Sequence, residues 1–314
     1  MASPTRRRLL RLMAASVAMS LAPRAGGKVV EWRGAALGAD VSILFSGATD
    51  RLAESAAARV LSEIERLEGI FSLQRADSEL VRLNTTGRLH APSPDLVHVL
   101  VRAREAHAAT HGRFDPTVQA LWRFHLDWYA ADPAGRRPSE SEIAGALAHV
   151  GFRSVRIAPD VIELPTGGAL TLNGVAQGYI TDRATALLRD AGFRHVLVDL
   201  GETRAIDARV DGGAWRVALP DGRRIGLADC ALATSSGNAT RLARNGDHHI
   251  FDPTTGRPAS HWRWLSVAHR SATVADALST GLYCLPPPQA IAATRAADDL
   301  RLWGETSVGE AIST

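Results

Sequence analysis

Asp276 and Thr280 lie four residues apart in the segment TVADALSTGLYCL, which begins at Thr273 and is expected to be a helix. Residues at this spacing share one side of a helix, so a carboxylate and a hydroxyl can reach the same cation. Oxygen ligands suit Mg²⁺, which also keeps waters and shares itself with phosphate groups. A structural interpretation stays open, because Thr273 and Asp276 also have the spacing of a capping box that serves only the helix start.

A histidine and two further acids mark other places where chemistry is possible. His249 lies close to Asp252 in the polar segment 248–256, where an imidazole can act as a general base near neutral pH. Asp199 and Glu202 follow an expected strand, at the edge where open sheets bind ligands. The ordinary alternatives are a solvated loop histidine and a pair of turn acids.

Residues 169–202 predict a strand, a turn, a helix and a second strand, with the turn at Gly174 and the second strand at 195–200. Free N–H groups and the helix dipole favour a phosphate at such a helix start. The alternative is an ordinary strand-helix crossover with a glycine-rich turn.

The other elements follow from apolar periodicity and from turn residues. The expected helices are 50–68, a short one ending at 84, 94–110, one starting at Pro116, 142–149, 273–283 and one after 288. The expected strands are 38–45, three runs within 154–172, 204–210, 215–219, 224–228, 230–234, a short one in 248–256, 264–269 and 300–303. The polar stretch 132–141 is expected to be a loop rather than a domain boundary.

The first 25 residues are expected to be a leader, followed by one domain at 30–314. Consecutive arginines at 6–8 precede a moderately apolar run that is too short for a membrane span. This pattern resembles a twin-arginine export signal and predicts a periplasmic protein. No clear cleavage site follows, so an uncleaved anchor is an alternative, as is a basic, frayed N-terminus.

Composition excludes several classes of protein. The 314 residues are 46% hydrophobic, which indicates a globular protein with a large core. The first 24 residues hold five arginines and no acid, so the formal charge of +3 becomes −2 without them. A near-neutral domain offers no basic face for nucleic acid. Whether Cys230 and Cys284 pair is left open.

Eight segments together resemble the ApbE family, the FAD:protein FMN transferases, in the order typical of that family. They are ALGADVSI, IERLEGIFSLQRADSELVRLN, GRFDPTV, LNGVAQGYITDRA, VLVDLGE, ATSSGN, HIFDPTTGRP and ADALSTGLY, and they cover most of residues 36–285. The resemblance implies an α+β fold related to the T-fold, with mixed sheets packed with helices in one compact catalytic unit. It also implies that FMN passes from FAD to a threonine or serine hydroxyl of an acceptor protein, with AMP leaving and Mg²⁺ on the pyrophosphate.

The resemblance assigns roles to individual residues. Asp276 and Thr280 match the side-chain metal ligands, with Ser279 beside them, and Gly174 matches the position that lends a backbone oxygen. His249 matches the histidine that we expect to be the base, so the expected catalytic residues are His249 and Asp276. The positions that match FAD contacts are Leu37, Gln74, Arg113, Phe114, Asp115, Thr171, Gln177 and Ile250.

Three positions depart from the pattern of the family. Gln74 replaces a common aromatic residue, so a stacking partner for a flavin or adenine ring is missing. Thr171 replaces the usual Asp, and Gln177 replaces the common Lys, which removes one charge of each sign. These changes leave the magnesium ligands intact and bear on the affinity for the nucleotide.

The LNGVAQGYITD and VDLGE segments and the leader are more similar to the NosX branch, which is associated with nitrous oxide reduction. The expected acceptor is therefore a membrane flavoprotein similar to NosR, which would place the protein near a membrane. Two alternatives remain at this stage: a non-catalytic FAD carrier, and an FAD pyrophosphatase that yields FMN and AMP.

Overall fold

The structure is a computed structural model that describes residues 29–132, 135–295 and 299–314, so the expected leader at 1–25 lies outside it. The largest sheet has eight strands, and the strand pairings in all the described sheets are antiparallel. Its order is β1 (Val29–Ala36), β2 (Ala39–Ser46), β6 (Val196–Asp199), β7 (Thr203–Ile206), β10 (Ala231–Ser236), β11 (Trp262–His269), β12 (Arg301–Thr306) and β13 (Ala311–Ser313). The smaller sheets are β3 (Arg88–His90), β5 (Val161–Glu163) and β4 (Arg156–Ile157), and the pair β8 (Trp215–Ala218) and β9 (Arg224–Leu227).

The helices begin where a short polar side chain accepts a hydrogen bond from the first turn. Ser78, Ser93 and Ser271 do this for α3 (Glu79–Thr86), α4 (Pro94–Ala109) and α8 (Ala272–Tyr283), and Ser139 forms a full capping box with Glu142 at α6 (Glu140–Leu147). The other helices of the described residues are α2 (Asp50–Phe71), α5 (Gln119–Ala131), α7 (Ala176–Asp190) and α9 (Pro287–Arg295). No helix in the part of the chain that the structure describes is long and apolar enough to span a bilayer.

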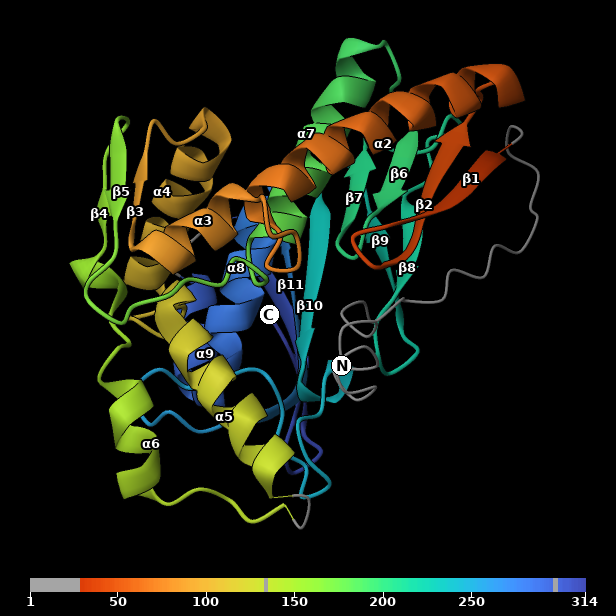
Figure 1. The fold of residues 1–314 in the computed structure, drawn as a ribbon. Coiled ribbons are helices and arrows are strands. Elements are labelled where there is room, and N and C mark those ends of the chain that lie inside the picture. The colour runs from red at the N-terminus through yellow and green to blue at the C-terminus, as the bar shows by residue number, and fades with distance from the viewer. Residues whose placement is uncertain (1–28, 133–134, 296–298) are drawn as a thin grey trace.

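Alternate residues of β2 belong to two different hydrophobic cores. Ile43 and Phe45 pack with residues of α2, α4 and α7, whereas Leu44 packs with the β8–β9 hairpin and its buried Trp215. Successive strand residues point to opposite faces, so helices cover one face of the large sheet and the hairpin covers the other. Figure 1 shows the long helix α2 crossing α7 on the helical side.

Helices α7 and α8 meet at a close contact that only glycine permits. A Cβ atom on Gly178 would lie 2.3 Å from the carbonyl oxygen of Ala272, which is well inside van der Waals contact. At this contact the N–H of Gly178 donates to Asp276 Oδ2 over 2.9 Å. The closeness of the two helices therefore places the Asp276 carboxylate beside the first turn of α7.

Asp182 of α7 fixes the start of α8. Its carboxylate accepts the backbone N–H groups of Ala272 and Thr273 at 2.9 and 3.0 Å and the hydroxyls of Ser271 and Thr273 at 2.7 Å. Nη1 of Arg204 also donates to it over 2.9 Å. The capping of α8 is thus performed by Ser271 and Asp182, and the interpretation of Asp276 as a capping residue paired with Thr273 is wrong.

Two predicted strands are absent from the described residues. Residues 169–172 form an extended segment outside any sheet, because the amide of Asn84 bonds both the N–H and the carbonyl of Leu170, at 2.7 and 2.8 Å. Residues 248–256 contain only isolated pairings, Arg241 with His248 and Phe251 with Pro258. In both places the local apolar pattern predicted a strand, but contacts with distant parts of the chain take the place of pairing in a sheet.

Gly178→Ala should destabilise the fold, because the new methyl group must push α8 away from α7. The expected loss is about 1–3 kcal/mol of unfolding free energy, typical of overpacking at a rigid contact. Gly145→Ala in α6 is the matched control, because a Cβ there meets nothing within 4 Å. It should be neutral or stabilising by about 0.5–1 kcal/mol. Urea unfolding of both variants measures this, and equal stabilities would show that the α7–α8 contact is not tight.

Candidate active site

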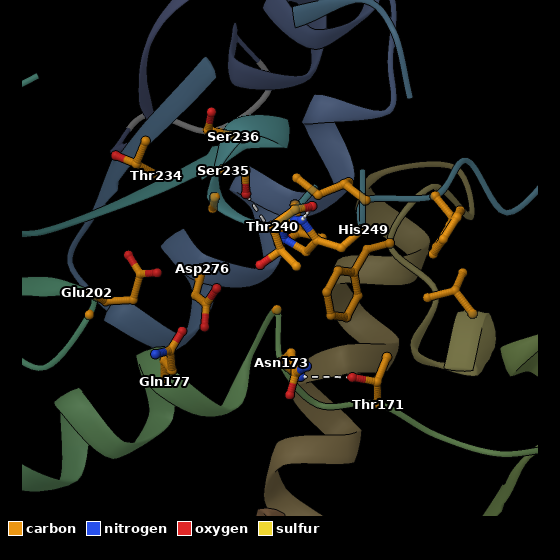
Figure 2. Close-up of a pocket in the computed structure, with 18 of the residues that line it drawn as sticks. Thr171, Asn173, Gln177, Glu202, Thr234, Ser235, Ser236, Thr240, His249 and Asp276 are labelled. Atoms are coloured by element: carbon orange, nitrogen blue, oxygen red, sulfur yellow. Dashed lines mark hydrogen bonds between the residues drawn. The ribbon is translucent and has the colours of Figure 1, made fainter. Parts of the chain in front are cut away.

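A pocket opens at the junction of α7 and α8, against the end of β10 and the segment that carries His249 (Figure 2). The residues predicted from sequence that line it are Arg113, Phe114, Asp115, Thr171, Gly174, Gln177, His249, Ile250, Asp276 and Thr280. Leu37 and Gln74 line a second cavity, which shares Asn173 and Gln177 with the first. Residues from distant parts of the sequence therefore line two cavities that share two residues, and Ser279 alone of the predicted set lines neither cavity.

The three residues predicted to hold a metal, Asp276, Thr280 and Gly174, line the same pocket. Asp276 is 3% exposed, and a Cβ atom on Gly174 would lie 2.7 Å from Thr280 Oγ1, so this glycine leaves space beside the hydroxyl. Ser279 does not line the pocket; its hydroxyl donates to the Asp276 carbonyl over 3.0 Å and bonds Ser235 Oγ over 2.9 Å.

The donor set has the oxygen atoms that Mg²⁺ prefers but only one carboxylate. Its members are hard oxygen donors, namely a carboxylate, a hydroxyl and a backbone carbonyl. Among the described residues, no three histidine, cysteine, aspartate or glutamate side chains gather as a metal cluster. A set with a single carboxylate suits a cation that is shared with the phosphates of a substrate, as Mg²⁺ often is.

The acids of the pocket are held in an environment that disfavours their charge. Burial raises the pKa of Asp276 to about 7, a shift opposed by the hydrogen bond from Gly178 and reinforced by the Asp182 charge. Burial also raises the pKa of Glu202 well above its ordinary value, and the charges of Asp276 and Asp199 act in the same direction. A bound cation would relieve this electrostatic strain, because it favours the charged form of a carboxyl.

His249 lines the pocket, and a backbone carbonyl lies next to one of its two ring nitrogens. The carbonyl oxygen of Thr240 lies 3.2 Å from Nδ1 and can only accept, so Nδ1 carries the proton and Nε2 keeps its lone pair. Burial, and then the charge of His248, lower the pKa of His249 to about 4. The imidazole is therefore unprotonated at neutral pH and can accept a proton from a substrate.

Arg113 and Asp115 build the wall of the pocket rather than its reactive centre. Arg113 Nη1 donates to both carboxylate oxygens of Asp252 over 2.5 Å, so Asp252 is not the partner of His249. Asp115 accepts the N–H groups of Thr117 and Phe152 over 2.8 and 3.1 Å. Asp115 also caps the short 3-10 turn that begins at Pro116.

Several N–H groups at the start of α7 are already bonded within the chain. The N–H groups of Val175 and Ala176 both donate to the Leu172 carbonyl, over 3.0 and 2.8 Å, and that of Gly178 is bonded to Asp276. An N–H group that is already bonded within the chain is not free for an anion. This stretch lines the pocket with Thr171, Asn173, Gly174 and Gln177.

The three positions that depart from the family pattern are spread over both cavities. Gln177 contacts Gly201, where a Cβ atom would lie 2.7 Å from Nε2, and Thr171 Oγ1 accepts the N–H of Asn173 over 3.3 Å. Gln74 lies in the second cavity near Leu37, which occupies the β1–β2 turn with φ of 55°. A left-handed backbone in a leucine is uncommon and marks a constrained position at this cavity.

Several residues of the pocket were not in the predicted set, notably Glu202, Thr234, Ser235, Thr240 and Trp122. Figure 2 shows Glu202, Gln177 and Asp276 grouped on one side, with His249 and Thr240 on the other. Glu202 was considered from its place after a strand but left with a turn acid as the alternative. The ATSSGN segment at 233–238 held the signal for Thr234 and Ser235, whereas nothing local indicates Trp122.

Comparison with known proteins shows the family to which the chain belongs. A model of the ApbE family matches residues 37–302. The chain belongs to the ApbE family. It is 29% identical to a FAD:protein FMN transferase of Vibrio cholerae, with 74% of each chain covered, and 28% identical to one of Treponema pallidum, with 72% of this chain and 70% of that one covered.

Solved ApbE structures have the same fold. A flavinyl transferase ApbE of Pseudomonas stutzeri, solved in its apo form, matches with a TM-score of 0.76 and 26% identity, and covers 94% of this chain and 97% of its own. The ApbE protein of Thermotoga maritima matches with a TM-score of 0.79 and 25% identity, over 91% and 97%. The predictions of an ApbE-family enzyme and of an α+β fold are confirmed, and the NosX-like branch stays a prediction.

The lowered pKa of His249 predicts that acid weakens the fold. The pKa of this imidazole is about 4 in the folded protein and 6.5 in the unfolded chain. Its contribution to the free energy of unfolding is therefore complete above pH 6.5 and is lost as the pH falls towards 4. Because the ring is only half-buried at the pocket, we expect a loss of about 1 kcal/mol between pH 7.5 and 5. The buried acids shift stability in the opposite direction, so the measured quantity is the difference between wild type and His249→Gln in urea unfolding. Equal pH dependence of the two would contradict the assignment.

Proposed function

We propose that this protein is a periplasmic, Mg²⁺-dependent transferase that moves FMN from FAD to a threonine or serine hydroxyl of an acceptor protein and releases AMP. The observation that carries the proposal is the meeting of Asp276, Thr280 and the Gly174 backbone in one pocket that also contains His249. Membership of the ApbE family, whose Vibrio cholerae and Treponema pallidum relatives are FAD:protein FMN transferases, supports the same reaction.

The residues have separable tasks in this reaction. The acceptor hydroxyl oxygen attacks the phosphorus of the FMN half, the bond between that phosphorus and the bridging oxygen breaks, and AMP leaves with this oxygen. The Nε2 atom of His249 accepts the proton of the hydroxyl, and the Thr240 carbonyl keeps the ring in the tautomer that can do so. Asp276, Thr280 and the Gly174 carbonyl would hold Mg²⁺, which neutralises charge on the phosphoryl oxygens when bound.

The acceptor and the compartment are inferred from the sequence. The arginines of the leader support export, and the similarity of two motifs to the NosX branch supports a NosR-like membrane flavoprotein of nitrous oxide respiration as acceptor. Residues 1–28 lie outside the described structure, so the sequence alone supports this part of the proposal.

Two rival functions use the same pocket and give different products. A non-catalytic FAD carrier would bind FAD without releasing AMP. An FAD pyrophosphatase would release FMN and AMP without needing an acceptor, because water would replace the protein hydroxyl. Chromatography of the products with and without acceptor therefore separates the three functions.

Incubation with FAD, MgCl₂ and the flavin domain of a NosR-like protein should add one FMN to the acceptor, together with one AMP for each FMN transferred. Mass spectrometry of the acceptor and chromatography of the nucleotide measure this. Asp276→Ala should abolish transfer, and His249→Ala should slow it at least about a hundredfold, the lower range for a lost general base, with FAD binding retained. A characterised family enzyme that labels this acceptor while the present protein does not would refute the proposal.

Thr280→Val should raise the Mg²⁺ concentration needed for half-maximal transfer about tenfold, because the isosteric side chain removes one oxygen ligand. Thr185→Val is the matched control, since it removes a buried hydroxyl from α7 that bonds only the Thr181 carbonyl, over 2.6 Å. The control should keep the wild-type requirement. A titration of transfer rate against MgCl₂ measures both, and identical curves for Thr280→Val and wild type would exclude Thr280 as a ligand.

A further inference from the structure

The segment that carries His249 has little regular structure of its own. Residues 240–249 fold back in a narrow hairpin, in which Arg241 pairs with His248 and the N–H of Leu242 donates to the Asp247 carbonyl over 2.8 Å. The N–H of His249 closes this hairpin on the Thr240 carbonyl over 3.2 Å, and this carbonyl also bonds the His249 ring. The orientation of the ring therefore depends on how firmly the hairpin is held.

Helix α5 holds the hairpin and the turn that follows it. Trp122, His125 and Tyr129 lie three and four residues apart, so they share one side of the helix. Trp122 meets the His249 ring edge to face at 5.9 Å, and His125 stacks on Phe251 at 4.7 Å. The Nε2 atom of His125 also bonds the Gly256 carbonyl over 2.9 Å.

The polar end of this contact is a buried phenol–carboxylate pair. The Tyr129 hydroxyl donates to Asp247 Oδ2, and the two residues are 9% and 6% exposed. Arg137 donates to the other carboxylate oxygen over 2.9 Å, and the amide of Asn245 donates to the Tyr129 hydroxyl over 3.3 Å. A buried carboxylate that is bonded on both oxygens has one low-energy position, so it fixes the returning arm of the hairpin two residues before His249.

We propose that Tyr129 and Asp247 are positioning residues for His249, which set the Nδ1–H tautomer and the direction of Nε2 through the hairpin. The role assigned to His249 rests on the proposed function, whereas its orientation is independent of it. Neither Tyr129 nor Asp247 lines the pocket, so both act only through the segment that they hold. His249, the residue that they orient, lies outside any helix or strand, so regular secondary structure does not fix its position.

Long-range ¹H–¹⁵N spectra of the histidine rings test this orientation without any acceptor. The His249 signals, identified by their loss in His249→Ala, should show the Nδ1–H tautomer in wild type. Tyr129→Phe should shift them towards the Nε2–H form that free imidazole prefers. Tyr179→Phe is the matched control, because it removes the hydroxyl of another buried tyrosine from its bond to a carboxylate, that of the half-buried Asp95 at 2.6 Å. An unchanged His249 tautomer in Tyr129→Phe would overturn the proposal.

Asp247 provides a second pair of variants in case Tyr129→Phe alters the fold. Asp247→Asn keeps an oxygen that accepts from Tyr129 and should keep the wild-type tautomer. Asp247→Leu has a similar size and no acceptor, and should reproduce the change seen in Tyr129→Phe. If both Asp247 variants give the wild-type spectrum, the pair does not position His249.

Transfer kinetics connect the orientation to the reaction. Tyr129→Phe should lower kcat about ten- to a hundredfold, as expected for a misplaced base, with KM for FAD unchanged. Added to His249→Ala, it should cause no further loss, because its effect passes through His249. An equal loss in both backgrounds would overturn the proposal. Full activity of His249→Ala would instead reject the proposed base, while the ring spectra would still report on the orientation.

Discussion

The arrangement of the site depends on the Asp182 carboxylate at the start of α8. This side chain of α7 accepts hydrogen bonds from two backbone N–H groups and two hydroxyls at the start of α8. It also forms an ion pair with Arg204 of β7. A single capping bond is worth about 1 kcal/mol, and an acid at this position also gains from the helix dipole. The cap therefore joins α7, α8 and the sheet at one point, and the contact of Gly178 with Ala272 sets the remaining distance.

The geometry of the pocket follows from this junction. Once α7 and α8 are in contact, Asp276 comes against the first turn of α7 and Thr280 comes against Gly174, one helical turn later. The fold places buried carboxyls and an imidazole in one pocket. The pKa of each carboxyl is raised and that of the imidazole is lowered, so the neutral form of each group is favoured. Such a site costs stability in the absence of ligands, which is common where groups are arranged for function.

The sequence predicted the parts of the site that local spacing and family motifs define. Helical spacing placed Asp276 and Thr280 on one side of a helix, and the family motifs predicted their roles and those of Gly174 and His249. The structure places all four residues on one pocket. The strand predicted at 169–172 was wrong because an extended buried segment has the same apolar pattern as a strand, and the partner that replaces the sheet is the side chain of Asn84, far away in sequence. The contact between α5 and the His249 hairpin could not be predicted either, because its residues lie more than a hundred positions apart.

A crystal structure with FAD and Mn²⁺, a substitute for Mg²⁺ that anomalous scattering locates, tests the central claim most directly. The account predicts the metal between Asp276, Thr280 and the Gly174 carbonyl, with the FAD pyrophosphate beside it and the Nε2 atom of His249 facing the phosphorus of the FMN half. A metal bound elsewhere, or FAD bound outside the pocket at the α7–α8 junction, would contradict it.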